Sequence, residues 1–482
     1  MTLNPYIEAH ELRELVLKKE VRPREVAEFF LARIEQLNPK LGAFMTVTAD
    51  RALADASRLE KMNASDAAKM PLFGVAYSLK DLVWTRDIRT TFGSKNYENW
   101  QAPADAELAV RLANSGGILL GKTTTPEFGL RPTTEGGLCP PARNPWNLEH
   151  TAGGSSGGSA SAVASGLHPV AQGSDGGGSI RVPSACCGVV GIKPSRGRIT
   201  RAPQEGEGWA GLSTTGPIAR TVRDAALMLD AMAGMLPGDP YAARPPSRPF
   251  VEEVSAHPKK LRLAVINHSA LGPVDAETLA ALESACGVFR EMGHRVEPLT
   301  LDPGAQLAQY ARVIVTASAS ALNIANPDLL DPMVRGSYEL GAKISAADYI
   351  RAVTAMHNTS REIVHALMPY DALLAPTLTR PAVRLGALPS NPATAADEIY
   401  GWIAFTFPFN STGQPAISLP NGFNKAGLPL AIQLVGRPGD EAAIIALAAE
   451  SERARLWAGQ ASSDGALKVC CRFTRCALQT RV

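Results

Sequence analysis

The sequence has no long hydrophobic run and no cluster of basic residues. No stretch reaches about 18 consecutive apolar residues, the length that a membrane-spanning helix requires, and the N-terminal segment shows no basic region followed by an apolar one. The 48 Lys and Arg residues almost balance the 46 Asp and Glu residues and are interspersed with them, which gives a net charge of +2. We therefore expect a cytoplasmic protein that binds neither membranes nor nucleic acids.

Patterns of metal ligands and disulfides are also lacking. The seven cysteines form no C-x-x-C pair and the eight histidines are scattered, so we predict no metal site, no cofactor and no disulfide framework. Cys186 and Cys187, in "SACCGVVG", are expected to pack as small apolar residues. A catalytic cysteine with a distant histidine stays open at this stage, although nothing nearby supports it.

Composition and periodicity indicate an α/β protein. With 482 residues, 45% of them hydrophobic, the chain can bury a large core, and helical and strand patterns alternate along it. Helices are predicted over residues 7–18, 23–37, 104–114, 221–234, 275–292 and 441–455, and strands over 72–79, 117–121, 169–173, 188–193, 261–266, 294–300, 415–420 and 428–436.

Two segments differ in character from the rest of the chain. The proline-rich residues 236–250, "LPGDPYAARPPSRPF", are the best candidate for an excursion or linker. The Cys/Arg-rich residues 466–482 show no convincing periodicity. We expect the latter to form a tail outside the core.

Residues 116–123, "GGILLGKT", match the phosphate-binding pattern G-x-x-x-x-G-K-[ST]. A P-loop follows a strand, opens a helix and needs small residues whose N–H groups turn toward a phosphate. Here the intervening "ILL" is typical of a buried strand, and "TTTP" after Lys122 is a poor start for a helix. We therefore interpret the segment from Gly116 to Thr123 as a strand end with a lysine, and not as the site of a P-loop NTPase.

The stretch "GGSSGGSASA", residues 153–162, allows several interpretations. A flexible linker is the usual meaning of such a composition. Its first five residues also fit the nucleophile elbow G-x-S-x-G of α/β-hydrolases, with Ser155 as nucleophile. The elbow requires a strand before it, whereas "RNPWNLEHTA" is predicted to be a loop, and no downstream histidine stands out as the base. An α/β-hydrolase therefore has little support, but it stays open.

Three consecutive glycines, Gly176, Gly177 and Gly178, lead into Ser179. Only glycine lets successive backbone N–H groups converge on one point without interference from a Cβ atom. This geometry suits an oxyanion hole beside a nucleophilic serine. A tight glycine turn with a capping serine fits the same residues equally well.

Lys80 is the candidate base for such a serine. It ends the apolar, strand-like run "PLFGVAYSLK", where desolvation would disfavour the ammonium and make a neutral, proton-accepting amine accessible. The alternative is an ion pair with Asp81 at a strand end, and this stretch alone favours that alternative.

Several motifs together resemble the amidase signature family of serine hydrolases. They are "GVAYSLKDLV", "NPW", "GGSSGGSASAVASG", "GSDGGGSIRVPSACCGVVGIKPS", "GPIARTVRDA", "PFNSTGQPAISLP" and "LPLAIQLVGRP". The resemblance implies a single α/β/α domain around a large mixed β-sheet. That domain would cover residues 1–465, with the proline-rich segment as an excursion from it.

The resemblance also implies a Ser-Ser-Lys triad. Ser179 would be the nucleophile, Ser155 the bridging serine after a cis peptide bond, and Lys80 the base. The oxyanion hole would consist of the N–H groups of Gly176, Gly177, Gly178 and Ser179. Ser156, Ser174, Asp175 and Arg181 would support this loop, either in catalysis or in structure alone. Phe128 and Gly129 would line the substrate site.

The implied activity is hydrolysis of amide bonds through an acyl-enzyme. We expect small hydrophobic or aryl amides as substrates, together with carbamates (urethanes) and esters, and a homodimer as the assembly. A glutaminase subunit of a tRNA-dependent amidotransferase is the alternative within the family. Against it, "GLSTTGPIAR" lacks the Leu-Asp-Gln-x-Gly-Pro form of that subunit.

Overall fold

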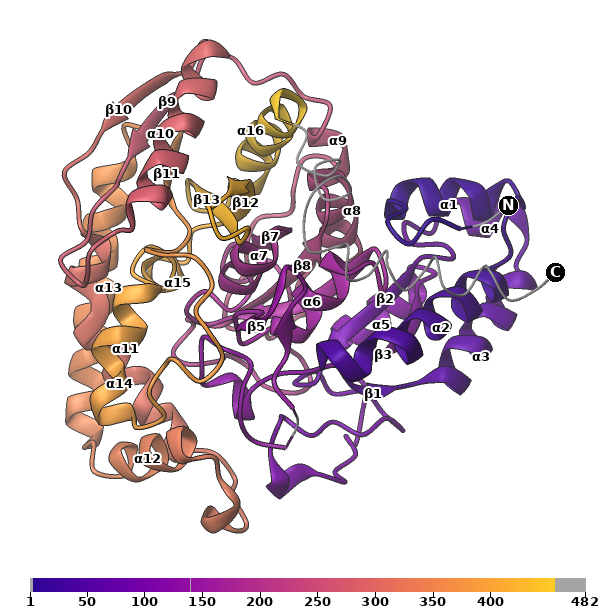
Figure 1. Cartoon of the computed structure of the whole chain (residues 1–482), viewed down its shortest axis with the longest axis horizontal. Helices are drawn as coiled ribbons and strands as arrows, with labels where there is room; N and C mark the ends of the chain where they lie inside the picture. Colours follow the sequence, from indigo (N-terminus) through magenta and orange to yellow (C-terminus); the bar gives the residue numbers. More distant parts are fainter. Residues whose placement is uncertain (1–2, 139, 456–482) are drawn as a thin grey trace.

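The computed structural model describes residues 3–138 and 140–455. Within these ranges, eleven strands form one mixed sheet in the order β1-β3-β2-β6-β8-β7-β12-β13-β11-β9-β10, and β4 pairs with β5 in a separate two-stranded sheet (Figure 1). The strands are β1 (Phe44–Val47), β2 (Ala76–Lys80), β3 (Ile118–Thr123), β4 (Arg143–Asn144), β5 (Asn147–Thr151), β6 (Val170–Asp175), β7 (Val190–Lys193), β8 (Thr214–Ala219), β9 (Arg262–Val265), β10 (Arg295–Pro298), β11 (Ala372–Pro376), β12 (Ala416–Phe423) and β13 (Pro429–Gly436).

Helices cover both faces of the large sheet. They are α1 (Ala9–Leu17), α2 (Pro23–Leu41), α3 (Ala49–Glu60), α4 (Ala64–Ala68), α5 (Glu107–Asn114), α6 (Gly157–Ala164), α7 (Arg181–Cys187), α8 (Val222–Met232), α9 (Phe250–Glu253), α10 (Ala276–Glu291), α11 (Pro303–Ser320), α12 (Pro332–Gly341), α13 (Ala346–Leu367), α14 (Pro392–Trp402), α15 (Pro408–Ser411) and α16 (Glu441–Ala454). Short 3₁₀ turns occur at Lys95–Tyr97, Glu127–Gly129 and Pro327–Leu329.

Strand β11 shows how the sheet separates two hydrophobic layers. Leu374 packs in a cluster with residues of α8, α10 and α16, whereas its neighbours Leu373 and Ala375 pack with residues of α11 and α13. This alternation follows from the two-residue period of a strand. Both faces are therefore apolar, and the predicted α/β/α architecture around a large mixed sheet is confirmed.

The predicted elements agree with the structure to within a few residues, with two kinds of difference. The segment "RNPWNLEHTA" was expected to be a loop, and this expectation is wrong: β4 and β5 form a short antiparallel ribbon through it. Its polar residues lack the alternation that signals a half-buried strand, because the ribbon lies outside the main sheet. Several elements were not predicted at all: the strands β1, β8 and β11 of the large sheet, and the helices α3, α4, α7, α9, α11, α12, α13, α14 and α15.

The P-loop-like segment is a strand, as interpreted. All six residues of β3 are buried, including Lys122. The Lys122 Nζ donates to Thr90 Oγ1 at 2.8 Å and to the carbonyl oxygen of Val83 at 2.5 Å, and it lies 3.8 Å from Asp81 Oδ1. Burial lowers the pKa of Lys122 to about 8, while the Asp81 charge opposes the shift. The lysine therefore binds neighbouring loop residues, and no α-helix begins directly after β3, as a P-loop would require.

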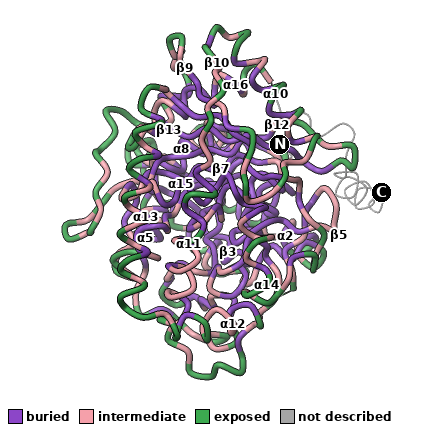
Figure 2. The backbone as a smooth tube through the Cα atoms, turned by 90° about the vertical axis from the view of Figure 1, so that its left-hand side faces the viewer, coloured by how far each residue is buried: buried purple, intermediate pink, exposed green. Residues whose placement is uncertain are grey.

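Figure 2 shows the buried interior surrounded by exposed loops. Residues 236–249 contain no helix or strand, and most of residues 241–249 are exposed. The predicted tail at residues 466–482 lies outside the described residues. No helix in the described part of the chain combines the length and apolar character needed to cross a membrane.

Candidate active site

Lys80 is the last residue of β2, an interior strand of the large sheet, and its side chain is fully buried. Its Nζ donates to Ser155 Oγ at 2.7 Å and to Ser174 Oγ at 3.0 Å. The predicted alternative, an ion pair with Asp81, is wrong because Asp81 turns to Thr91 and Lys122 instead. The polar surroundings of the Lys80 amine are thus two serine hydroxyls.

Burial lowers the pKa of Lys80 well below its ordinary value of 10.5, and the negative charge of Asp175 only partly opposes this shift. Two neutral hydroxyls do not compensate an ammonium for its lost hydration. The neutral amine, which can accept a proton, is therefore favoured over the charged form in this position.

The glycine- and serine-rich stretch carries Ser155 between β5 and α6. The Gly154–Ser155 peptide bond is cis, as the family resemblance implied. Every residue from 153 to 165 is buried, which is incompatible with a flexible linker. Gly154 packs against the backbone of Thr133 so closely that a Cβ atom would overlap it. The small side chains are therefore required by packing.

Ser179 lies in the turn between β6 and α7 and is partly exposed. In the described part of the chain, its hydroxyl makes no hydrogen bond and is accessible to a substrate. The backbone N–H of Ser156 donates to the Ser179 carbonyl oxygen at 3.1 Å, and the Ser156 hydroxyl contacts the backbone of Ser174. These bonds connect the loop of Ser155 directly to the loop of Ser179.

The peptide between Gly177 and Gly178 is held at both of its polar groups. The Gly177 carbonyl accepts from Thr406 Oγ1 at 2.8 Å, and the Gly178 N–H donates to Asp175 Oδ1 at 2.7 Å. Gly178 has a φ of +132°, and a Cβ atom there would overlap Thr406. The predicted role of Gly178 as an oxyanion donor does not fit this geometry, because its N–H is already bound.

The next peptide is oriented differently. The Gly178 carbonyl accepts from the N–H of Val182 at 2.6 Å. Because the N–H and C=O of a trans peptide point in opposite directions, the Ser179 N–H points away from α7. Among the described residues, the N–H groups of Gly176, Gly177 and Ser179 have no hydrogen-bond partner. These three N–H groups are therefore the available donors.

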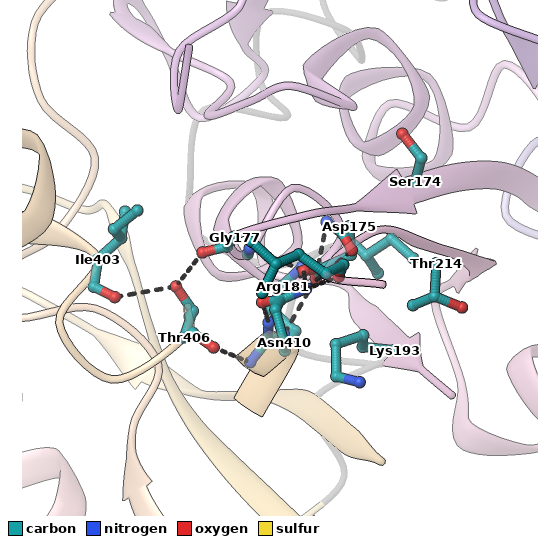
Figure 3. A network of polar contacts seen from close by, with 12 residues as sticks. Ser174, Asp175, Gly177, Arg181, Lys193, Thr214, Ile403, Thr406 and Asn410 are labelled. Atoms are coloured by element: carbon teal, nitrogen blue, oxygen red, sulfur yellow. Dashed lines mark hydrogen bonds and ion pairs between the residues drawn. The ribbon is translucent and has the colours of Figure 1, made fainter. Parts of the chain in front are cut away.

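Asp175 and Arg181 form a fully buried ion pair beneath this loop. Figure 3 shows Asp175 turned toward Arg181, while Ser174, its neighbour on β6, points the other way. Arg181 donates to both carboxylate oxygens of Asp175, to the Asn410 side chain at 2.7 Å and to the Thr406 carbonyl at 2.7 Å. Asp175 and Arg181 therefore join the glycine loop to the segment that carries Thr406 and Asn410.

The charge state of Asp175 follows from these contacts. Burial alone would raise its pKa, but the Arg181 charge and hydrogen bonds outweigh burial, so the pKa of Asp175 lies well below its usual range. The carboxylate also accepts from the N–H groups of Gly178 and Ile180. An ionised Asp175 thus holds the loop in one conformation.

We predict that Thr406 positions the glycine loop. Replacing it by Val keeps the shape but leaves the Gly177 carbonyl without its donor. We expect kcat to fall about 10- to 100-fold, less than the roughly 10²- to 10³-fold loss that follows removal of an oxyanion donor itself. Thr406→Ser keeps the hydroxyl and should retain most of the activity. Steady-state kinetics of both variants on one amide substrate checks this. Equal losses in the two variants would contradict a role for the hydroxyl.

Two cavities meet at Ser179. The first, called here the aromatic cavity, has a volume of about 470 Å³ and is lined by Ser155, Ser174 and a set of aromatic side chains. The second, called the aliphatic cavity, has a volume of about 340 Å³ and lies against α11, α12 and α14. Gly129, Gly176, Ser179 and Trp209 line both cavities. Phe128, predicted with Gly129 to line the substrate site, lies in the wall of the aromatic cavity.

Comparison with known proteins decides the family. The family model described as Amidase matches residues 25–445. The chain belongs to the amidase signature family. It is therefore an enzyme of the amidase class, a hydrolase of carbon–nitrogen bonds.

Named relatives of this amidase agree in overall length and fold. It is 34% identical over 474 residues to an acylamidase of Rhodococcus erythropolis, covering 95% of this chain and 98% of that protein. It is 36% identical over 475 residues to a 6-aminohexanoate-cyclic-dimer hydrolase of Paenarthrobacter ureafaciens, covering 92% of this chain and 94% of that protein. A bacterial aryl acylamidase of the amidase signature family superposes with a TM-score of 0.87 at 29% identity, covering 95% of this chain and 98% of that one.

Sequence reasoning missed several residues that shape the site. Thr406 and Asn410 lie within or just before the motif "PFNSTGQPAISLP", but nothing in that pattern indicates contact with Gly177 or Asp175. Gln172, which accepts from the Lys80 N–H at 2.9 Å, was likewise not singled out. These residues reach the site only through contacts between segments that are distant in the sequence, so no local signal could have identified their roles.

Proposed function

We propose that this amidase cleaves amides through an acyl-enzyme on Ser179, with Ser155 as proton relay and Lys80 as base. The contact that supports this most strongly is the 2.7 Å hydrogen bond from the buried Lys80 amine to Ser155 Oγ. A neutral amine in this place can take the proton of Ser155, which in turn takes the proton of Ser179 as Ser179 Oγ attacks the carbonyl carbon.

The proposed reaction then proceeds in two halves. The carbonyl oxygen becomes an oxyanion facing the N–H groups of Gly176, Gly177 and Ser179. The C–N bond breaks, its electron pair stays on nitrogen, and the relay returns a proton to the leaving amine. Water next attacks the ester carbon, gives its proton to the same relay, and releases the acid while Ser179 regains its hydrogen.

We propose small hydrophobic amides and aryl amides as substrates, with carbamates (urethanes) and esters as further ones. The two cavities at Ser179 expose more apolar than polar surface, which supports this choice over glutamine, whose α-ammonium and α-carboxylate groups would need charged partners. The acylamidase and aryl acylamidase relatives act on such bonds by name.

A substrate panel combined with active-site labelling tests the proposal. Acetanilide, a primary aliphatic amide, a phenyl carbamate and glutamine would be assayed by release of arylamine or ammonia. A serine-reactive phosphonate should label Ser179, as identified by peptide mass spectrometry. Labelling of Ser155 alone would support an elbow-type nucleophile, and activity on glutamine alone would favour the amidotransferase glutaminase.

The depressed pKa of Lys80 predicts a particular pH dependence. Only the neutral amine can accept a proton, so kcat/KM should increase with pH along a limb set by Lys80 and reach its plateau well below pH 10.5. Asp175 is already ionised far below that limb and should not contribute to it. A pH profile of kcat/KM on a neutral amide measures the limb. A limb centred near pH 10.5 would contradict a desolvated lysine base.

A further inference from the structure

The two cavities at Ser179 differ in their relation to the proton relay. Ser155 and Ser174, the two hydroxyls bound by Lys80, line the aromatic cavity and not the aliphatic one. The proton that completes C–N cleavage must come from the relay, so the leaving nitrogen must lie on the side where Ser155 is accessible. We infer that the aromatic cavity receives the amine half of the substrate and the aliphatic cavity receives the acyl half.

The wall of the aromatic cavity suits an aromatic amine. Phe92 and Phe128 stack at 6.2 Å with an interplanar angle of 20°, and Trp100 contacts Phe92 at 5.4 Å and Trp84 at 5.7 Å between ring centroids. Flat rings at such spacings favour offset or edge contacts with a further ring. An anilide presents that ring on its nitrogen.

Backbone conformation supports a functional role for this wall. Phe92, Phe128 and Trp209 have φ values of +53°, +50° and +57°, a region that bulky residues rarely adopt. All three residues line the aromatic cavity. Left-handed backbone at bulky residues persists where the surrounding structure enforces it, and it concentrates at binding sites.

The aliphatic cavity suits an uncharged alkyl acyl group. Its walls include Val315 of α11, Met333 of α12 and Ile399 of α14, and the rings of Trp209, Tyr400 and Phe407 complete its apolar lining. Its two arginines are already paired: Arg131 lies 3.9 Å from Asp331, and Arg312 lies 2.6 Å from Asp397. No free cation in its described lining awaits a carboxylate, so acyl chains longer than acetyl and without charge are the expected occupants.

The aromatic cavity also has a polar side for the second half of the reaction. Thr200, Gln204, Ser213 and Thr215 line it. Once the amine has left, water can enter along these groups and reach the ester carbon next to Ser155. The same cavity thus serves amine departure and water entry, as a single proton relay requires.

The assignment rests on the proposed acyl-enzyme function and is tested by crossing variants with substrates. Ala396 lines the aliphatic cavity on α14, so Ala396→Phe should lower kcat/KM at least about tenfold on hexanamide and leave acetanilide within about twofold. Thr394→Phe, on the exposed side of the same helix, is the matched control and should change neither substrate.

The reciprocal variant is Phe92→Leu, which opens the aromatic cavity. It should lower kcat/KM on acetanilide about five- to tenfold, an effect expected for loss of one aromatic contact. The kcat/KM on hexanamide should stay within about twofold of the wild-type value. Phe29→Leu, in α2 and outside both cavities, is its control.

The outcomes separate the two proposals. If Ala396→Phe impairs acetanilide and Phe92→Leu impairs hexanamide, the halves are assigned the wrong way round, while the acyl-enzyme function stands. Equal effects of a variant on both substrates, or none, overturn the assignment as well. If the wild type cleaves no amide and Ser179 resists a phosphonate label, the proposed function itself fails.

Discussion

Replacing Ser179 by Ala is expected to lower kcat about 10⁴- to 10⁶-fold, as loss of a serine nucleophile does in other hydrolases. The substitution removes one hydroxyl that has no hydrogen-bond partner among the described residues, so the free energy of unfolding should change by less than about 0.5 kcal/mol. Steady-state rates on acetanilide and thermal unfolding of both proteins measure the two effects separately.

The same experiment extends to the base. Lys80→Met should lower kcat nearly as much as Ser179→Ala does. The kcat of the double variant should be no lower than that of either single variant, because residues that act as a unit show non-additive losses. Lys80→Arg is the informative control. Arginine keeps the donor but stays protonated, so it should be as inactive as Met. Substantial activity in Lys80→Arg would show that residue 80 only orients Ser155.

The strands and helices that were predicted have local signals in the sequence. Buried runs such as residues 72–79 and 428–436 are apolar over the length of a strand, and glycines mark helix ends, as Gly42 and Gly166 do with φ values of +61° and +68°. The strand order could not be predicted from these signals. β6 lies between β2 and β8 through pairings between distant segments.

The site was predictable to a different degree. The motif resemblance named Lys80 and Ser155, which the structure brings to 2.7 Å. It also named Gly178 as an oxyanion donor, whereas the structure shows its N–H bound to Asp175. The direction of an N–H group depends on the local φ and ψ angles and on its hydrogen-bond acceptor, and neither can be read from the sequence. The bond from Gly178 to Asp175 is invisible in a pattern of glycines. The residues that line the cavities could not be predicted either, since α11 and α14 lie far from Ser179 in the sequence and near it only in the folded chain.

Arg181→Met is expected to destabilise the protein by about 3–5 kcal/mol, since it leaves the buried Asp175 carboxylate without its cation. Chemical denaturation should show a lower midpoint. Activity should fall as well, because Arg181 also donates to the Thr406 carbonyl and the Asn410 side chain. Arg24→Met, at an exposed ion pair with Glu28, is the control and should cost no more than about 1 kcal/mol.

The double variant Asp175→Leu with Arg181→Met separates stability from catalysis. With both charges removed, no unpaired buried charge remains, and a substantial part of the lost stability should return. Activity should not return, because Gly178 and Ile180 have lost the carboxylate that accepted their N–H groups, and the loop that ends in Ser179 is no longer held. Recovery of both stability and activity would mean that the ion pair serves the fold alone. Recovery of stability without activity would identify Asp175 as a positioning residue for the glycine loop.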